Sequence, residues 1–189
     1  MEEEAETKME TPPLGWIDRI GKEEARKDRL LRQDLIGGFV GAIVLSLLLW
    51  FFVAHKLEDT GFYTDEFGAL EMFMMYFAGA FAVAMAVLKL IVRRRNILRP
   101  LDVASLLVLS VAHAVLLVSF PFDFEHVDAA LPGFLQWTVG WMSDWVGAAI
   151  LLLGLIGALI GAAFTSVVYV GVRREMANSL TEEGPHPED

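Results

Sequence analysis

Residues 145–172 read WVGAAILLLGLIGALIGAAFTSVVYVGV and contain no Asp, Glu, Lys or Arg. An α-helix rises about 1.5 Å per residue, so this stretch exceeds the roughly 30 Å of hydrocarbon in a bilayer. An uncharged run of this length is too long for the core helix of a soluble domain. It therefore predicts a membrane-spanning helix that is tilted or protrudes from the bilayer.

Three other runs have the same character, at residues 35–54, 72–88 and 103–122. Together with their apolar flanks, the four runs predict spans at about 35–54, 69–92, 101–120 and 145–172. Pro100 suits the first position of the third span, and Pro121 suits its end. The predicted fold class is all-α, a polytopic membrane protein built as a four-transmembrane-helix bundle.

The composition agrees with this class and excludes others. The chain has 189 residues, of which 55% are hydrophobic and 21% charged, with a net charge of −10 and no cysteine. These values exclude a soluble globular domain, a disordered chain and a nucleic-acid binder. The lack of cysteine excludes disulfides, thiolate metal sites and iron–sulfur clusters, and we expect no cofactor.

Four segments outside the spans have their own predictions. Residues 1–13 are an acidic tail that we expect to be disordered, and residues 14–34 are expected to form an interfacial amphipathic helix on the cytoplasmic surface. That helix is either a solvated lead into the first span or a docking site for a partner. We expect a short interfacial helix at residues 134–139 and a second acidic tail at residues 173–189.

The basic residues predict the orientation. Of the 15 Lys and Arg residues, all except Lys56 fall on the side that holds both termini and the loop at 93–99. Because basic residues accumulate in cytoplasmic segments, we expect both termini in the cytoplasm. We expect the plasma membrane as the location.

Small residues recur every four positions on several spans, so that each set marks one helix face. Such faces allow close helix packing, either inside one bundle or between copies or partner chains. The glycines predicted to pack are Gly37, Gly41, Gly154, Gly157 and Gly161.

Three polar residues on three spans are predicted to share one depth, namely Ser46, Tyr76 and His113. A polar group facing lipid would lack partners, so we expect His113 to point inward and to bond Ser46 or Tyr76 as a buried polar cluster. His113 is either a neutral side chain that hydrogen-bonds one helix to another or a proton-linked switch.

The predicted outer loops suggest two binding sites. Imidazole and carboxylate ligands for a divalent metal ion are offered by His55, Glu58, His126 and Asp128, which are otherwise solvated loop residues. An aromatic platform for a lipid, quinone or sugar ring is offered by Trp137, Trp141 and Trp145. The alternative for these tryptophans is an ordinary interfacial belt.

Motifs for zinc hydrolases, serine hydrolases and phosphate-binding loops are absent from the sequence. We therefore expect a non-catalytic accessory or scaffold subunit of a membrane assembly, whose partners are the lipid bilayer and either further copies of itself or another membrane protein. One alternative is an oligomeric small-molecule or ion transporter. Another is an outer-surface protein that binds a metal ion, a lipid or a quinone.

Overall fold

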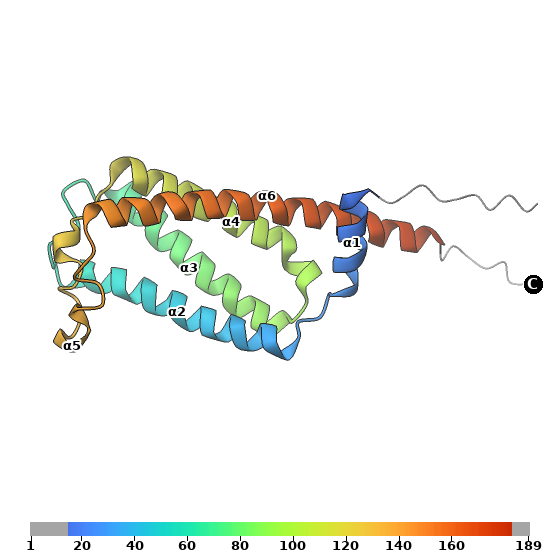
Figure 1. The fold of residues 1–189 in the computed structure, drawn as a ribbon, viewed down its shortest axis with the longest axis horizontal. Coiled ribbons are helices and arrows are strands. Elements are labelled where there is room, and N and C mark those ends of the chain that lie inside the picture. Colours follow the sequence, from blue (N-terminus) through green and yellow to red (C-terminus); the bar gives the residue numbers. More distant parts are fainter. Residues whose placement is uncertain (1–14, 183–189) are drawn as a thin grey trace, which may run out of the picture.

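The computed structural model describes residues 15–182, and every regular element in that range is helical. The elements are α1 (Trp16–Arg26), α2 (Arg32–Leu57), α3 (Ala69–Val92), α4 (Arg95–Ser119), the 3-10 turn η1 (Phe124–His126), α5 (Gly133–Gln136) and α6 (Asp144–Glu182), as Figure 1 shows. The tail predicted over residues 1–13 and the end of the C-terminal tail, residues 183–189, lie outside the described residues.

Four of these helices, α2, α3, α4 and α6, are long and apolar enough to cross a membrane. This confirms the all-α fold with four candidate spans. The bounds of α3 coincide with the predicted 69–92, and α2 is longer at both ends than the predicted 35–54. The agreement follows from the uncharged runs, since an apolar segment of this length satisfies its backbone in a bilayer only as a helix.

The start of α4 differs from the prediction at 101. The helix begins at Arg95, so Pro100 lies inside it and not at its first position. Asp28 explains the earlier start, because its backbone oxygen accepts from Arg95 N at 2.7 Å and its carboxylate accepts from Asn96 N at 3.0 Å. The first N–H groups of a helix have no partner within it, and Asp28 supplies one from outside.

The end of α6 also differs from the prediction at 172. The helix continues to Glu182, so residues 173–182 of the predicted acidic tail are helical. This segment begins Arg-Arg-Glu-Met-Ala, and these residue types favour the helix interior. The hydropathy of the sequence marks where the apolar run stops, which is a different point from where the helix stops.

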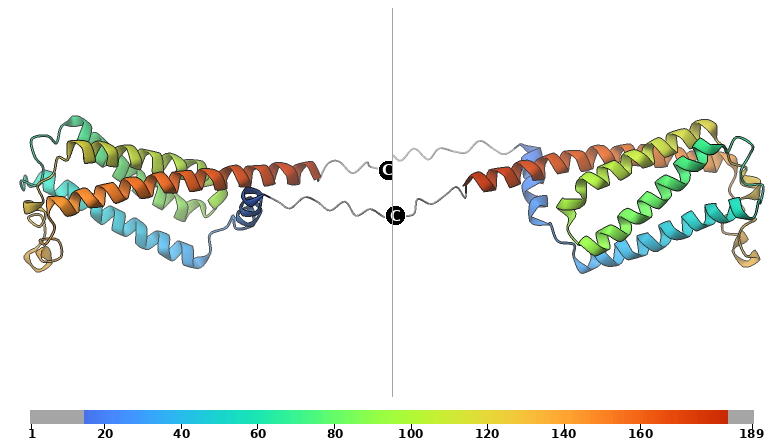
Figure 2. Two further views of the ribbon diagram at one scale, coloured as in Figure 1. Left: turned by 45° about the horizontal axis from the view of Figure 1, so that its top comes forward. Right: turned by 180° about the vertical axis from the view of Figure 1, so that it is seen from behind.

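The predicted helix over 14–34 is divided in two. α1 ends at Arg26, and α2 begins at Arg32. The side chain of Asp34 accepts a hydrogen bond from the backbone N–H of Leu31 at 2.9 Å, which fixes the new start. α1 packs across α6 (Figures 1 and 2).

The spanning helices pack as a row in the order α2, α3, α4, α6, with each helix against the next. Among the described residues, α2 and α6 have no comparable packing between them, and Figures 1 and 2 show them diverging towards the α1 end. The bundle is therefore open along one side.

Ion pairs join the elements at the α1 end. Arg99 on α4 pairs with Glu24 on α1 at 2.8 Å, and Arg95 on α4 pairs with Asp34 on α2 at 2.7 Å. Lys89 on α3 pairs with Asp102 on α4 at 2.7 Å. These pairs hold α1 and the ends of three spans in one arrangement.

Candidate functional site

The end of the bundle opposite α1 is closed by a cluster of aromatic rings, which we call the aromatic cap: Phe62, Phe67, Phe122 and Phe124. Phe62 is 1% exposed, and its ring centroid lies 5.3 Å from that of Phe122 and 5.4 Å from that of Phe124. Ring pairs at this spacing are favourable beyond the apolar area they bury. The cap is thus a small, well-packed core outside the helix pairs.

Hydrogen bonds tie the two loops that carry the cap to each other and to α2 and α6. Asp123 N donates to Phe62 O at 2.8 Å, and Phe124 N donates to the Asp144 carboxylate at 3.0 Å. The Tyr63 hydroxyl donates to Phe52 O at 2.8 Å, and burial raises the pKa of this hydroxyl, so it stays protonated as a donor. The two loops and the first turn of α6 therefore form one unit.

His55, near the end of α2, is 1% exposed beneath this unit. Its Nε2 lies 3.1 Å from Val127 O, and its Nδ1 lies 2.6 Å from the Thr60 hydroxyl oxygen. A carbonyl oxygen only accepts, so Nε2 carries a proton and donates to it. The ring joins α2 to the loop after η1, and it also packs against Phe62 with ring centroids 4.5 Å apart.

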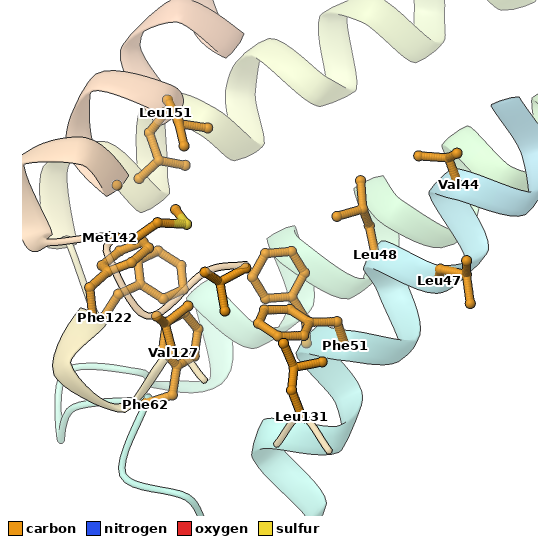
Figure 3. Close-up of a pocket in the computed structure, with 15 residues that line it drawn as sticks. Val44, Leu47, Leu48, Phe51, Phe62, Phe122, Val127, Leu131, Met142 and Leu151 are labelled. Carbon is orange, nitrogen blue, oxygen red and sulfur yellow. The ribbon is translucent and has the colours of Figure 1, made fainter. Parts of the chain in front are cut away.

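A pocket of about 430 Å³ lies directly below the cap, between α2 and α6. Figure 3 shows Leu47, Leu48 and Phe51 of α2 facing it from one side and Leu151 of α6 from the other. Phe62, Phe122, Val127 and Met142 close the cap end. Its volume lies within the range of about 300–1,000 Å³ that is typical of ligand pockets.

The lining of this pocket has no polar side chain among its 15 residues. Leu47 is nevertheless 61% exposed and Ile150 51% exposed, so the pocket is open on the side where α2 and α6 diverge. An all-apolar site has no group that transfers a proton or attacks a substrate. It can hold hydrocarbon by burying apolar surface, and it can do little else.

A second, polar pocket of about 480 Å³ lies at the α1 end. Its charged lining includes Arg95, Arg99 and Lys89, each of which pairs with a carboxylate of the same region. The hydrogen bond from Arg99 holds the pKa of the Glu24 carboxyl below its usual value. The basic groups are thus neutralised locally, and this pocket is a structural junction.

The residues predicted to bind a metal ion do not form a site. Within residues 15–182, no group of three or more His, Cys, Asp or Glu side chains could hold a metal ion. His55 is committed to Thr60 and Val127, while His126 lies 3.2 Å from Asp123. Glu58 and the carboxylate of Asp128 complete no ligand set with them.

The predicted buried cluster of Ser46, Tyr76 and His113 is not formed either. Ser46 donates to Ala42 O at 2.8 Å, and His113 Nδ1 lies 2.8 Å from Leu109 O, so both bond their own helix. Tyr76 donates to Phe52 O at 3.4 Å. A backbone carbonyl four residues earlier satisfies a Ser or His without a partner helix, which the depth argument overlooked.

The three tryptophans do not stack on one helix face. α5 ends at Gln136, earlier than the predicted end at 139, and residues 137–141 form turns before α6. Trp137, Trp141 and Trp145 are exposed at 77%, 67% and 85%, and none of the ring contacts within residues 15–182 joins two of them. Their exposure is that of a belt, not that of a built platform.

The predicted packing glycines separate into two groups. Gly154 lies against the ring of His113 and Gly161 lies near Leu106, so both pack α6 on α4. A Cβ added at Gly37, Gly41 or Gly157 would meet no atom within 4 Å. The first group acts inside the bundle, and the second leaves open helix surface.

The sequence reasoning did not identify the aromatic cap as a pocket wall, nor Gly21 and Gly171 as a contact between α1 and α6. The density of Phe in residues 120–124, FPFDF, was the available signal for the cap.

The structure as a whole defines an all-helical protein with four candidate membrane spans and a lateral apolar pocket at one end. No family model, curated protein or solved structure matches the chain.

Proposed function

We propose that this protein is a non-catalytic accessory or scaffold subunit of a membrane assembly. The observation that supports this proposal is the open face of α2. Only 6% of the residues in the most apolar stretch of α2 are buried, against 17% in the corresponding stretch of each of the other three spans. A Cβ added at Gly37 or at Gly41, four residues apart, would meet no atom within 4 Å, and Gly37 borders the polar pocket at the α1 end. Small residues at this spacing allow a second helix to approach closely in lipid.

The occupant we propose for this face is a spanning helix of another chain, whether a second copy or a different membrane protein. We place the assembly in the plasma membrane, with both termini cytoplasmic and the aromatic cap outside. The distribution of basic residues supports this orientation, because Lys56 is the one Lys or Arg near the cap end.

Co-purification in a mild detergent tests the proposal. The full chain is isolated with an affinity tag from membranes that also contain an untagged copy, and the bound chains are identified by mass spectrometry. We expect a stoichiometric membrane protein or the untagged copy with the wild type, and its loss with Gly41→Leu. The Cβ of a residue at position 41 has no other atom within 4 Å, so we expect the fold to tolerate the substitution.

Val40→Leu is the matched control, since Val40 is 53% exposed on the neighbouring position of α2. It should retain the partner. If the wild type brings down neither a partner nor a second copy, or if Gly41→Leu retains what the wild type binds, the proposal is wrong.

A further inference from the structure

We propose that the pocket between α2 and α6 holds one hydrocarbon chain of a membrane lipid whose headgroup has no net negative charge. This inference goes beyond the accessory role and does not depend on it. It rests on three properties of the pocket: its lining, its depth along α2 and the charge of the residues around its cap end.

The lining selects hydrocarbon. All 15 lining residues are apolar or glycine, so a polar ligand would lose its hydrogen bonds to water without replacement. The open side lies between two spanning helices, where Leu47 and Ile150 are exposed. A ligand that is already dissolved in the bilayer can enter there without crossing water.

The depth matches one leaflet. On α2 the lining extends from Val44 to Phe52, and α2 ends at Leu57. At about 1.5 Å per residue, the pocket covers a range of about 8 to 20 Å from that end of the helix. Half of a bilayer core is about 15 Å thick, so the chain of a lipid in the leaflet on the cap side lies at this depth.

The charge around the cap end selects the headgroup. Lys56 is the one Lys or Arg in residues 56–68 and 120–144, which hold Glu58, Asp59, Asp65, Glu66, Asp123, Glu125, Asp128 and Asp144. Asp128 directly follows the lining residue Val127, and Asp144 lies one turn before Gly147, which also lines the pocket. These carboxylates repel an anionic headgroup and favour a zwitterionic or uncharged one.

Photo-crosslinking tests the proposal. The full chain is placed in nanodiscs with equal amounts of phosphatidylcholine and phosphatidylglycerol, one of which carries a diazirine on its acyl chain. Labelled peptides are then mapped by mass spectrometry. We expect the phosphatidylcholine probe to label peptides that contain Leu47, Leu131 and Leu151. The phosphatidylglycerol probe should label the same peptides at least about tenfold less, as a tenfold weaker affinity would produce.

Two variants fill the pocket from opposite walls, Leu47→Trp on α2 and Leu151→Trp on α6. Each has a control on the same helix that is absent from the lining and lies about half a helical turn away from it, Phe39→Trp at 59% exposure and Ile156→Trp at 45% exposure. The pocket variants should lose the labelling, and the controls should keep it. Leu47 is largely exposed, so Leu47→Trp remains a fair test if Leu151→Trp fails to fold.

Equal labelling of the pocket and control variants would overturn the proposal, as would preferential labelling by the anionic probe. Absence of lipid label from these peptides in the wild type would also overturn it. The accessory role is tested separately, because Gly41→Leu should abolish partner binding and leave the lipid label unchanged.

Discussion

Gly21 of α1 and Gly171 of α6 touch backbone to backbone where the two helices cross. A Cβ added at Gly21 would lie 2.5 Å from the carbonyl carbon of Gly171, and one at Gly171 would lie 2.9 Å from Ile17 O. Backbone atoms cannot yield as the end of a flexible side chain can. The crossing therefore depends on glycine at both positions, and it sets the distance at which α1 docks on α6.

Gly21→Ala should separate α1 from α6 and destabilise the protein by about 1–3 kcal/mol, the usual cost of overpacking. Thermal unfolding in detergent measures the loss, and hydrogen exchange should rise selectively in α1. Gly37→Ala is the control, since its new methyl group meets no atom. That variant should be neutral or more stable by up to about 1 kcal/mol, because alanine favours a helix. Equal stability of Gly21→Ala and the wild type would contradict the close crossing.

Glu24→Gln should weaken the junction at the α1 end by about 1–2 kcal/mol, because the Arg99 side chain would keep its charge and lose a charged partner. The pKa of Glu24 lies below its ordinary value of 4.5 in the fold, mainly through the hydrogen bond from Arg99. The stabilisation is therefore present above pH 4.5 and is lost as the pH falls through the lower, folded pKa.

The wild type should thus lose stability in acid, and Glu24→Gln should lack that part of the pH dependence. Glu23→Gln is the control, because Glu23 forms an exposed pair with Lys27. Exposed pairs of this kind contribute little to stability. Identical acid profiles for Glu24→Gln and the wild type would show that the Glu24–Arg99 pair does not stabilise the fold.

Gly154→Ala should destabilise the contact between α4 and α6 by about 1–3 kcal/mol, because the new methyl group collides with the His113 ring. His113→Ala removes that ring, so the double variant should recover part of the loss. A double-mutant cycle on thermal unfolding measures the coupling, which for contacting residues is about 0.5–3 kcal/mol. Additive effects would mean that the two residues do not meet in the folded protein.

His55→Ala should release the loop after η1 from α2. The variant leaves Val127 O without its donor and opens a cavity against Phe62, with an expected cost of about 2–4 kcal/mol. Limited proteolysis should then cut residues 121–143 faster than in the wild type. His126→Ala is the control, since His126 is exposed and its contact is with Asp123. Faster cleavage of both variants to the same extent would argue against a special role for His55.

Single cysteines should report the proposed topology, because the chain has no cysteine of its own. Asp59→Cys and Ala129→Cys should react with a membrane-impermeant maleimide in intact cells. Lys22→Cys and Ser179→Cys should react only after the membrane is permeabilised. All four positions are exposed, so differences in labelling reflect the side of the membrane. Protection of Ala129→Cys in intact cells would contradict the orientation.

The positions of the spans were largely predictable from the sequence, and the errors lie at the helix ends. The C-terminal bound of α3 was predicted because the arginines at 93–95 directly follow its last apolar residues and the helix ends there. α4 was misjudged at Pro100, because the donors of its first turn are satisfied by Asp28, 67 residues before Arg95 in the chain. A local pattern cannot show a partner so distant.

The candidate site was less readable. His55 was predicted as a metal ligand. In the structure it is buried and its Nε2 donates a hydrogen bond to Val127 O. The predicted partners of His113 were wrong, since its ring bonds Leu109 O and packs against Gly154. His113 was expected to point into the bundle and does lie against α6, whereas His55 was expected in an outer loop and is buried. In both cases the partner depended on how the helices and loops pack.

The sequence by itself determined that this protein is a set of four long apolar helices. That property is local, because in lipid each helix must satisfy its own backbone hydrogen bonds. Only the tertiary structure decided which helix faces meet, and hence that α2 and α6 diverge below the aromatic cap and leave an apolar pocket. The physical reason is that packing in a membrane depends on the fit of surfaces from distant residues, such as Gly154 on His113, and hydropathy carries no information about that fit.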